Sequence, residues 1–326
     1  MLITRTPFRM SFFGGGTDYE EYFSKFGGCV LSTTIDKYCY LSMRNMPAFF
    51  EYKNQFTYSK IERFNSPDEV IHPLVRNALK FIPSDRIQIA YDADLPACSG
   101  LGSSSAFAVG LLQGLHAMKN EHPDKMNLAK EAIHLERVLC NEAGGVQDQL
   151  AAAFGGLNKI EFNQNGYLVT PLKLSEERKK LFQNNLLLLF TGFTHLSFEI
   201  AQDQKNNLPA TLPQLHEMKA MVSHAEKILL EGNLDDFGSL LHHTWQLKRT
   251  LSKKITNSEI DRIYEKAIKN GALGGKLLGA GGGGFMLLYA PEENHEKLKK
   301  AFDDFKFVPF SFEDSGTKII YENQKI

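Results

Sequence analysis

The 326-residue chain is 43% hydrophobic and has a formal net charge of −1 at pH 7, which is enough apolar content for two domains. It lacks the basic surplus typical of nucleic-acid-binding proteins, and no apolar run approaches the roughly 20 residues that span a bilayer. The amino terminus lacks the pattern of a signal peptide. The four cysteines form no CxxC pair, so we expect reduced thiols in a cytoplasmic protein.

Hydrophobic patterning predicts both helices and strands along the chain. The predicted strands, in chain order, are 29–35, 38–44, 87–91, 157–162, 186–191, two around a glycine loop at 271–290, and a pair at 307–312 and 317–321. The predicted helices are 70–81, 104–119, 127–142, most of 194–271, and 292–302. Because strands and helices do not alternate strictly, the pattern predicts an α+β fold.

The first distinctive segment, Thr6–Asp18, reads TPFRMSFFGGGTD. Arg9 lies in an apolar, strand-like stretch, and Gly14–Gly16 predict a turn that leads to Thr17 and Asp18. Taken alone, the segment is explained by an ordinary turn in which Asp18 caps a short helix.

The second segment, Pro96–Gly110, reads PACSGLGSSSAFAVG. Gly100 and Gly102 allow a tight turn and close approach of a ligand, and the helical spacing that follows begins at three serines. Unpaired N–H groups and the positive end of the helix dipole favour a phosphate there. A capped helix after a glycine turn is the alternative, and the segment matches neither a Walker A loop nor GxGxxG.

A second glycine cluster lies in Lys276–Phe285, which reads KLLGAGGGGF. Four consecutive glycines cost backbone entropy and add no side-chain packing. Two glycine loops in one chain therefore suggest two backbone surfaces that meet one ligand.

Two acidic residues are candidates for chemistry. Glu136 lies beside the inner stripe of the predicted helix 127–142, and Asp148 follows Gly144 and Gly145. On the residues alone, Glu136 could instead pair with Arg137 or Lys130 on the surface, and Asp148 could cap the helix that follows.

The three segments, in this order, resemble motifs 1, 2 and 3 of the GHMP kinases, and the resemblance spans nearly the whole chain. It implies an amino-terminal domain at 1–180 like domain 2 of ribosomal protein S5, and a ferredoxin-like domain at 181–326. It also implies an active site between them that uses ATP and Mg²⁺.

The resemblance also implies roles for single residues. Asp148 is the expected proton acceptor or orienting group for the substrate hydroxyl, and Arg9 the residue that keeps it ionised or stabilises the transferring phosphoryl group. Ser104 and Glu136 are the expected Mg²⁺ ligands, with Ser103 and Ser105 as substitutes for Ser104. The expected nucleotide-binding residues are Gly100, Leu101, Gly102, Ser103, Ser104, Ser105, Gly281 and Gly282. The expected substrate-binding residues are Thr17, Asp18, Gly282 and Gly283.

Motif 1 also bears on the acceptor. Galactokinases carry Glu-His-Thr-Asp where this chain has Gly15-Gly16-Thr17-Asp18, and the segment is similar to that of D-glycero-D-manno-heptose 7-phosphate 1-kinases. A sugar phosphate and ATP are then the expected partners, with no nucleic acid or membrane. Another sugar such as L-fucose or galactose, and a regulator without turnover, are the alternatives. Lys37, Arg44 and Lys276 are candidate ligands for the sugar's phosphate, and a homodimer is left open.

Overall fold

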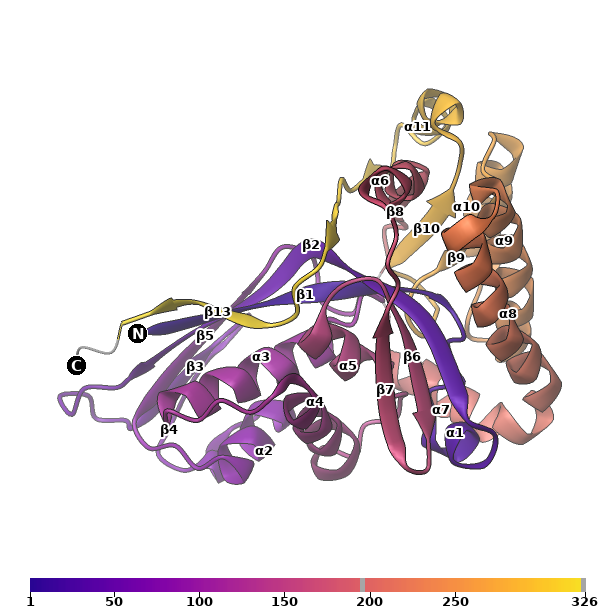
Figure 1. The fold of residues 1–326 in the computed structure, drawn as a ribbon. Helices are drawn as coiled ribbons and strands as arrows, with labels where there is room; N and C mark the ends of the chain where they lie inside the picture. Colours follow the sequence, from indigo (N-terminus) through magenta and orange to yellow (C-terminus); the bar gives the residue numbers. More distant parts are fainter. Residues whose placement is uncertain (194–196, 324–326) are drawn as a thin grey trace.

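The computed structural model describes residues 1–193 and 197–323. The chain forms two domains, each built on its own sheet (Figure 1). The first residues of the predicted helical region, 194–196, lie outside the described part. From Ser197 onward that region is helical as predicted, up to Lys269.

The large domain is built on a sheet that has nine strands among the described residues, in the order β13-β1-β2-β5-β3-β4. β6 and β12 also pair with β2, and β7 pairs with β6. Of the described pairings in this sheet, β3 with β5 is parallel and the others are antiparallel. The strands are β1 (Leu2–Phe13), β2 (Gly28–Asn45), β3 (Asn54–Thr57), β4 (Ile61–Phe64), β5 (Ile87–Ala93), β6 (Asn158–Asn163), β7 (Gly166–Pro171), β12 (Phe312–Glu313) and β13 (Lys318–Glu322).

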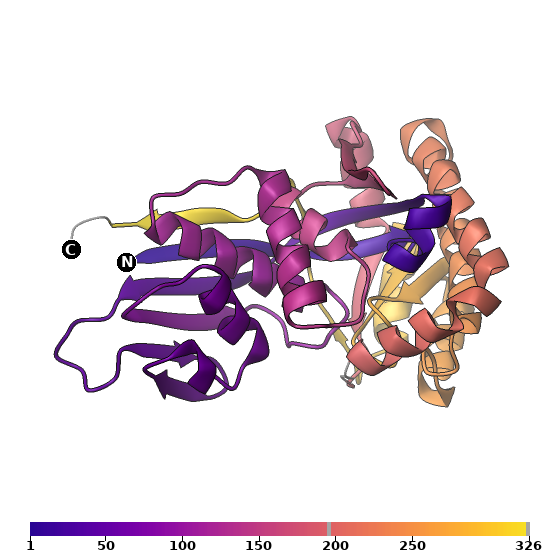
Figure 2. The same cartoon turned by 90° about the horizontal axis from the view of Figure 1, so that it is seen from below.

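Helices cover one face of the large sheet (Figures 1 and 2). They are α1 (Glu20–Phe26), α2 (Pro73–Phe81), α3 (Ser103–Met118), α4 (Lys125–Ile133) and α5 (Gln147–Phe154), with a 3₁₀ turn at Pro67–Glu69. α3 is the central helix, because it is apolar around most of its circumference and packs against β1, β2, α4 and α5. Its amino terminus is therefore fixed firmly relative to the sheet.

The small domain has the antiparallel sheet order β11-β8-β10-β9. Its strands are β8 (Leu186–Phe190), β9 (Gly274–Leu277), β10 (Phe285–Tyr289) and β11 (Lys306–Phe307). Its helices are α6 (Glu176–Asn184), α7 (Ser197–Asn207), α8 (Leu212–Glu231), α9 (Leu234–Thr250), α10 (Ser258–Lys269) and α11 (His295–Ala301), with 3₁₀ turns at Leu208–Ala210 and Glu292–Asn294. The mixed helix and strand content confirms the α+β prediction.

Two predicted strand features are wrong. The segments 29–35 and 38–44 belong to one long strand, β2, whose pairing with β1 shifts register opposite Pro7 and Phe8. The segments 307–312 and 317–321 do not pair with each other, since β11 pairs with β8, β12 with β2 and β13 with β1. Alternation along a segment indicates a strand but does not identify its partner.

The predicted helix 127–142 is also different. α4 ends at Ile133 and continues as a π-helical turn, His134–Leu139. A π turn inserts one residue and rotates the faces that follow it. Glu136 is therefore buried, whereas Leu139, three residues further along, is exposed.

The chain passes from one sheet to the other between β7 and β8, so the predicted boundary near 180 falls within the connecting α6. After the small domain the chain returns, and β13 pairs with β1 in the large sheet, where the backbone amide of Asn323 donates to the carbonyl oxygen of Met1. The two described chain ends therefore lie side by side (Figure 1). No helix in the described part is long and apolar enough to cross a membrane.

Candidate active site

A cavity of about 630 Å³ lies between the two domains, a volume that suits a small-molecule ligand. We call its lining residues numbered 9–148 the large-domain wall, and those numbered 198–280 the small-domain wall. The sequence-predicted residues Arg9, Asp18, Glu136 and Asp148 all lie on the large-domain wall.

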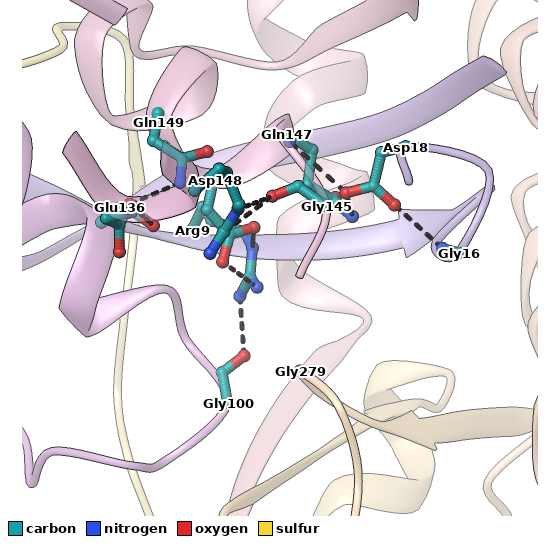
Figure 3. Close-up of polar contacts among 12 residues, drawn as sticks. Arg9, Gly16, Asp18, Gly100, Glu136, Gly145, Gln147, Asp148, Gln149 and Gly279 are labelled. Atoms are coloured by element: carbon teal, nitrogen blue, oxygen red, sulfur yellow. Dashed lines mark hydrogen bonds and ion pairs between the residues drawn. The ribbon is translucent and has the colours of Figure 1, made fainter. Parts of the chain in front are cut away.

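Arg9 and Asp148 form a bidentate ion pair on this wall (Figure 3). Arg9 Nε and Nη2 donate to Asp148 Oδ1 and Oδ2, both at 2.7 Å, and Nη1 donates to the carbonyl oxygen of Gly100 at 2.6 Å. Arg9 is 6% exposed, and two parallel charge-assisted bonds fix geometry as well as charge. The pair therefore holds the Asp148 carboxylate in one orientation at the cavity.

The segment 100–105 forms a glycine turn that leads into α3. Gly102 adopts a left-handed conformation with φ 73° at the N-cap, and no side chain caps the first turn. A Cβ on Gly102 would lie 3.3 Å from Asp148 Oδ2 and 3.1 Å from Arg9 Cγ, so the turn sits directly on the ion pair. An uncapped helix amino terminus at the cavity favours an anion.

The two glycine loops touch each other. A Cβ on Gly279 would lie 2.4 Å from Gly100 Cα, and the Phe285 amide donates to the carbonyl oxygen of Ser99 at 3.1 Å. Gly279 and Ala280 line the cavity. The Gly282 amide is instead bound to the carbonyl oxygen of Ile255 at 2.9 Å. The ligand-binding roles of Gly281, Gly282 and Gly283 stay predictions, since none of the three is among the lining residues.

Glu136 is 1% exposed and lies opposite the first turn of α3. Ser105 Oγ donates to Glu136 Oε2 at 2.8 Å, and Gln149 Nε2 donates to the same oxygen (Figure 3). Among the described residues these bonds leave Oε1 for a ligand. Ser104 is exposed at the cavity, so Ser105 is the serine beside the carboxylate.

Carboxylate and hydroxyl oxygens suit Mg²⁺. The described residues hold no group of three or more His, Cys, Asp or Glu side chains placed to bind a metal. An ion at Glu136 would therefore need further oxygens from a ligand, as a phosphate supplies.

Asp18 is 3% exposed and receives hydrogen bonds from the Gly16 amide at 2.9 Å and from Gln147 Nε2 at 2.9 Å (Figure 3). Burial and then the Asp148 charge raise the pKa of Asp18 above its usual value. A Cβ on Gly145 would lie 1.8 Å from Asp18 Oδ2, so a glycine is required for this packing. Asp18 and Asp148 therefore lie in different environments: amide groups bind Asp18, whereas the Arg9 guanidinium binds Asp148.

Thr17, unlike Asp18, is not among the residues that line the cavity. Its hydroxyl donates to the carbonyl oxygens of Gly14 and Cys29 and accepts from the Cys29 amide, and the side chain is fully buried. Its predicted contact with substrate stays a prediction, and these three bonds already explain a threonine at this place.

Two buried lysines lie on the small-domain wall. Lys276 Nζ donates to the carbonyl oxygen of Phe12 at 2.8 Å, and Lys248 Nζ donates to those of Leu277 and Gly279. Burial, followed by the charge of Arg9, lowers the pKa of Lys276 to about 7. Burial, followed by the charge of Lys276, holds the pKa of Lys248 well below its usual value.

Sequence reasoning missed Lys248, because a lysine in the last turn of a helix is ordinarily an exposed partner of the helix dipole. Of the other predicted phosphate ligands, Lys37 is bound to Asp36 and Arg44 to Gln88, and neither is among the lining residues.

Sequence reasoning also missed an aromatic wall at one end of the cavity. It consists of Phe56, Tyr58, His72, Tyr91 and Phe107. The rings of Phe56 and Tyr58 stack with centroids 4.8 Å apart, and Tyr91 meets Phe107 edge-on at 5.2 Å. These rings come from separate elements, so no local pattern in the sequence indicates them.

Comparison with known proteins places this geometry in a family. The family of GHMP kinases N terminal domains matches residues 69–156, and that of GHMP kinases C terminal domains matches residues 225–307. A Campylobacter jejuni protein named D-glycero-alpha-D-manno-heptose 7-phosphate kinase is 30% identical, and the alignment covers 97% of each chain. The chain belongs to the GHMP kinase family.

Two further proteins illustrate the range of this kinase family. A bifunctional fucokinase/GDP-fucose pyrophosphorylase from Arabidopsis thaliana is 27% identical over 91% of this chain and 31% of its own length. The crystal structure of a D-glycero-D-manno-heptose 1-phosphate kinase from Bacteroides thetaiotaomicron shares the fold with a TM-score of 0.82 at 23% identity, covering 99% of this chain and 100% of the other. Membership of this family identifies the protein as an ATP-dependent kinase.

Proposed function

We propose that this kinase transfers the γ-phosphoryl group of ATP to the anomeric hydroxyl of D-glycero-D-manno-heptose 7-phosphate, in the synthesis of nucleotide-activated heptose. The Arg9–Asp148 pair beside an uncapped helix amino terminus is the observation that carries the chemistry. The heptose is supported by the Campylobacter relative, which is similar over nearly the full length of both chains.

Asp148 is the proposed acceptor of the hydroxyl proton. Its carboxylate faces the cavity while Arg9 holds both oxygens from behind. An anomeric hydroxyl is more acidic than an ordinary alcohol, so a carboxylate is a sufficient base. As the proton moves to Asp148, the anomeric oxygen bonds to the γ-phosphorus, the bond to the bridging oxygen breaks, and ADP leaves.

The donor nucleotide is proposed to bind along the large-domain wall. The first-turn amides of α3 would receive its phosphates, and the aromatic wall would stack on its base. The turn 100–102 rests on the Arg9–Asp148 pair, so a phosphate bound there lies next to the proposed base. This placement brings donor and acceptor together.

The residues that fit Mg²⁺ are Glu136 and a serine of the first turn of α3, and the geometry favours Ser105 over Ser104. When bound, Mg²⁺ neutralises charge that develops on phosphate oxygens. The protein's own contribution is to orient the carboxylate through hydrogen bonds from Ser105 and Gln149.

The terminal phosphate of the sugar is proposed to meet the small-domain wall. The ammonium groups of Lys276 and Lys248 donate to backbone carbonyls rather than to carboxylates, and burial makes each harder to charge without an anion. A dianion would relieve the cost of burying two like charges together. We therefore propose that Lys276 and Lys248 together bind the phosphate of the sugar.

The test is a panel of acceptors under identical ATP and Mg²⁺. We expect D-glycero-D-manno-heptose 7-phosphate to give a higher kcat/KM than unphosphorylated heptose, mannose 6-phosphate, galactose and L-fucose. A ³¹P spectrum of the product should show a phosphate on the anomeric carbon. A higher kcat/KM for L-fucose or galactose would overturn the heptose assignment.

A further inference from the structure

Two side chains of the cavity bury polar atoms that have no hydrogen-bond partner in the described part of the chain. They are Ser11 Oγ and Gln147 Oε1, on residues that are 6% and 7% exposed. Ser11 lies two residues beyond Arg9 on β1, and Gln147 precedes Asp148 at the start of α5. Buried polar atoms are nearly always hydrogen-bonded, so these two need an explanation.

The orientation of the Gln147 amide is fixed by Asp18. Asp18 Oδ2 accepts a hydrogen bond from Gln147 Nε2 at 2.9 Å (Figure 3). The amide nitrogen therefore points to the carboxylate, and Oε1 is left without a donor.

An open space over Gly15 lies next to Ser11 Oγ and to Gln147 Nε2. A Cβ on Gly15 would meet no heavy atom closer than 3.9 Å, and the two atoms at that distance are Gln147 Nε2 and Ser11 Oγ. Gly15 is not among the glycines with positive φ. Neither the backbone conformation nor the packing requires a glycine here, and all three residues line the cavity. We call this space the Gly15 niche.

We propose that the Gly15 niche receives one hydroxyl group of the acceptor sugar, bound by Ser11 Oγ and the Gln147 amide. The proposal rests on the proposed function of sugar phosphorylation. A hydroxyl group both donates and accepts, so it supplies a partner for Ser11 Oγ and can accept from the second hydrogen of Gln147 Nε2, whose first hydrogen is bound to Asp18. Ser11 lies about 7 Å along β1 from Arg9, so this hydroxyl differs from the one that Asp148 activates.

The niche then acts as a specificity determinant. A sugar that lacks the matching hydroxyl leaves Ser11 Oγ buried and unpaired, and such sites discriminate strongly against the deoxy analogue. Asp18 contributes by holding the Gln147 amide and is a positioning residue in this arrangement.

Three variants test the proposal. Gly15→Ala fills the niche with a methyl group that the fold tolerates. Ser11→Ala removes a hydroxyl that makes no bond within the protein, so it should leave the melting temperature unchanged or raise it. Ser32→Ala is the matched control, because Ser32 Oγ is also buried without a partner but Ser32 is not among the lining residues.

Binding is measured by calorimetry with a non-hydrolysable ATP analogue present. The probes are D-glycero-D-manno-heptose 7-phosphate and its monodeoxy analogues, or the corresponding series of whichever sugar gives the highest kcat/KM. We expect Ser11→Ala to weaken binding of the parent sugar about three- to tenfold, the value of one neutral hydrogen bond. Gly15→Ala should weaken the parent sugar more, yet leave one monodeoxy analogue unaffected. Nucleotide affinity should not change.

Two results would overturn the proposal: Ser11→Ala binding the sugar as Ser32→Ala does, or Gly15→Ala weakening every monodeoxy analogue equally. Because the series follows the preferred sugar, these results are independent of the heptose assignment. If another sugar is preferred and its deoxy analogues show the expected binding pattern, the heptose assignment is overturned and the Gly15 niche is supported.

Discussion

The two walls of the cavity use charge in opposite ways. The large-domain wall carries the carboxyl groups Asp18, Glu136, Glu142 and Asp148, and hydrogen bonds from neighbouring side chains or amides hold Asp18, Glu136 and Asp148. The small-domain wall carries Lys248 and Lys276, whose ammonium groups are held by backbone carbonyl oxygens. Acids that can take a proton or hold a cation therefore face cations that can hold an anion.

The two glycine loops also differ, in what surrounds their backbone amides. The loop 100–102 leads into an uncapped helix terminus at the cavity, whereas the loop 279–284 gives amides of Gly282 and Gly284 to the carbonyl oxygens of Ile255 and Phe193. Similar glycine runs thus have different surroundings. We expect a change at Asp148 to alter kcat, and changes at Lys248 or Lys276 to alter the KM for the sugar.

The largest expected effect is that of Asp148→Asn. Asparagine keeps the shape but cannot accept the proton, so we expect kcat to fall by about 10²–10⁴. Nucleotide affinity, measured by calorimetry, should change little because the turn 100–102 is intact. Turnover near that of the wild type would show that Asp148 is no required base.

Gly100→Ala tests the contact between the two walls. Its Cβ would lie 2.4 Å from the Leu278 carbonyl oxygen, at φ 83°. Gly192→Ala is the control, with φ 89° and no atom of the described residues within 4 Å of the added Cβ. The left-handed strain should lower the free energy of unfolding of both variants by about 1–2 kcal/mol, and the clash should cost Gly100→Ala roughly 1–3 kcal/mol more. Equal chemical denaturation curves would contradict a tight contact.

Glu136→Gln tests the proposal that Glu136 is a Mg²⁺ ligand. The amide keeps one oxygen but loses the charge, so we expect the Mg²⁺ concentration for half-maximal rate to rise by about tenfold or more. Ser105→Ala should raise it more than Ser104→Ala does. The assignment fails if Mg²⁺ titrations of all three variants match the wild type.

Lys276 makes the small-domain wall sensitive to pH. With a pKa of about 7, the side chain is charged below that pH and neutral above it. The KM for the sugar phosphate should therefore rise as pH increases through 7, by up to about tenfold per unit, while Lys276→Met should have a high KM throughout. Lys37→Met is the control. A flat profile in the wild type would exclude Lys276 as the phosphate ligand.

The same pKa affects stability. The unfolded chain holds the Lys276 proton up to its ordinary pKa of 10.5, whereas the folded chain releases it near 7. Between these values the unfolded state binds more protons, so this lysine makes the free energy of unfolding rise with pH. Chemical denaturation of the wild type and of Lys276→Met across that window should show the difference.

The smallest effect on turnover is expected for Thr17→Val. Valine leaves the Cys29 amide without its acceptor and removes two donated bonds, so the free energy of unfolding should fall by about 1–3 kcal/mol. If Thr17 supports the loop rather than the sugar, kcat/KM stays within about twofold, the scatter expected without a lost contact. A large rise in KM would instead support the predicted substrate contact.

Local sequence predicted the elements better than their partners. The glycine turn and α3 were predicted within one residue, because the serines and the apolar spacing mark a helix start. The Arg9–Asp148 pair joins residues 139 positions apart, and no local pattern shows that contact. Both residues were identified through the family resemblance.

The cavity itself could not be predicted. Lys248 looks like an ordinary helix-end lysine, and its burial depends on how α9 packs against β9. The π turn that buries Glu136 has no clear signature in the sequence, so a regular helix was the natural prediction. Such features depend on packing between distant segments rather than on neighbouring residues.

The pairing of β1 with β13 bears on how this protein is made. β1 leaves the ribosome long before β13, which is one of its two neighbours in the sheet but lies at residues 318–322. At ordinary rates of translation the edge of β1 then stays unpaired for on the order of tens of seconds. An unpaired strand edge can join another chain, so nascent copies of this kinase are most exposed to aggregation before β13 emerges.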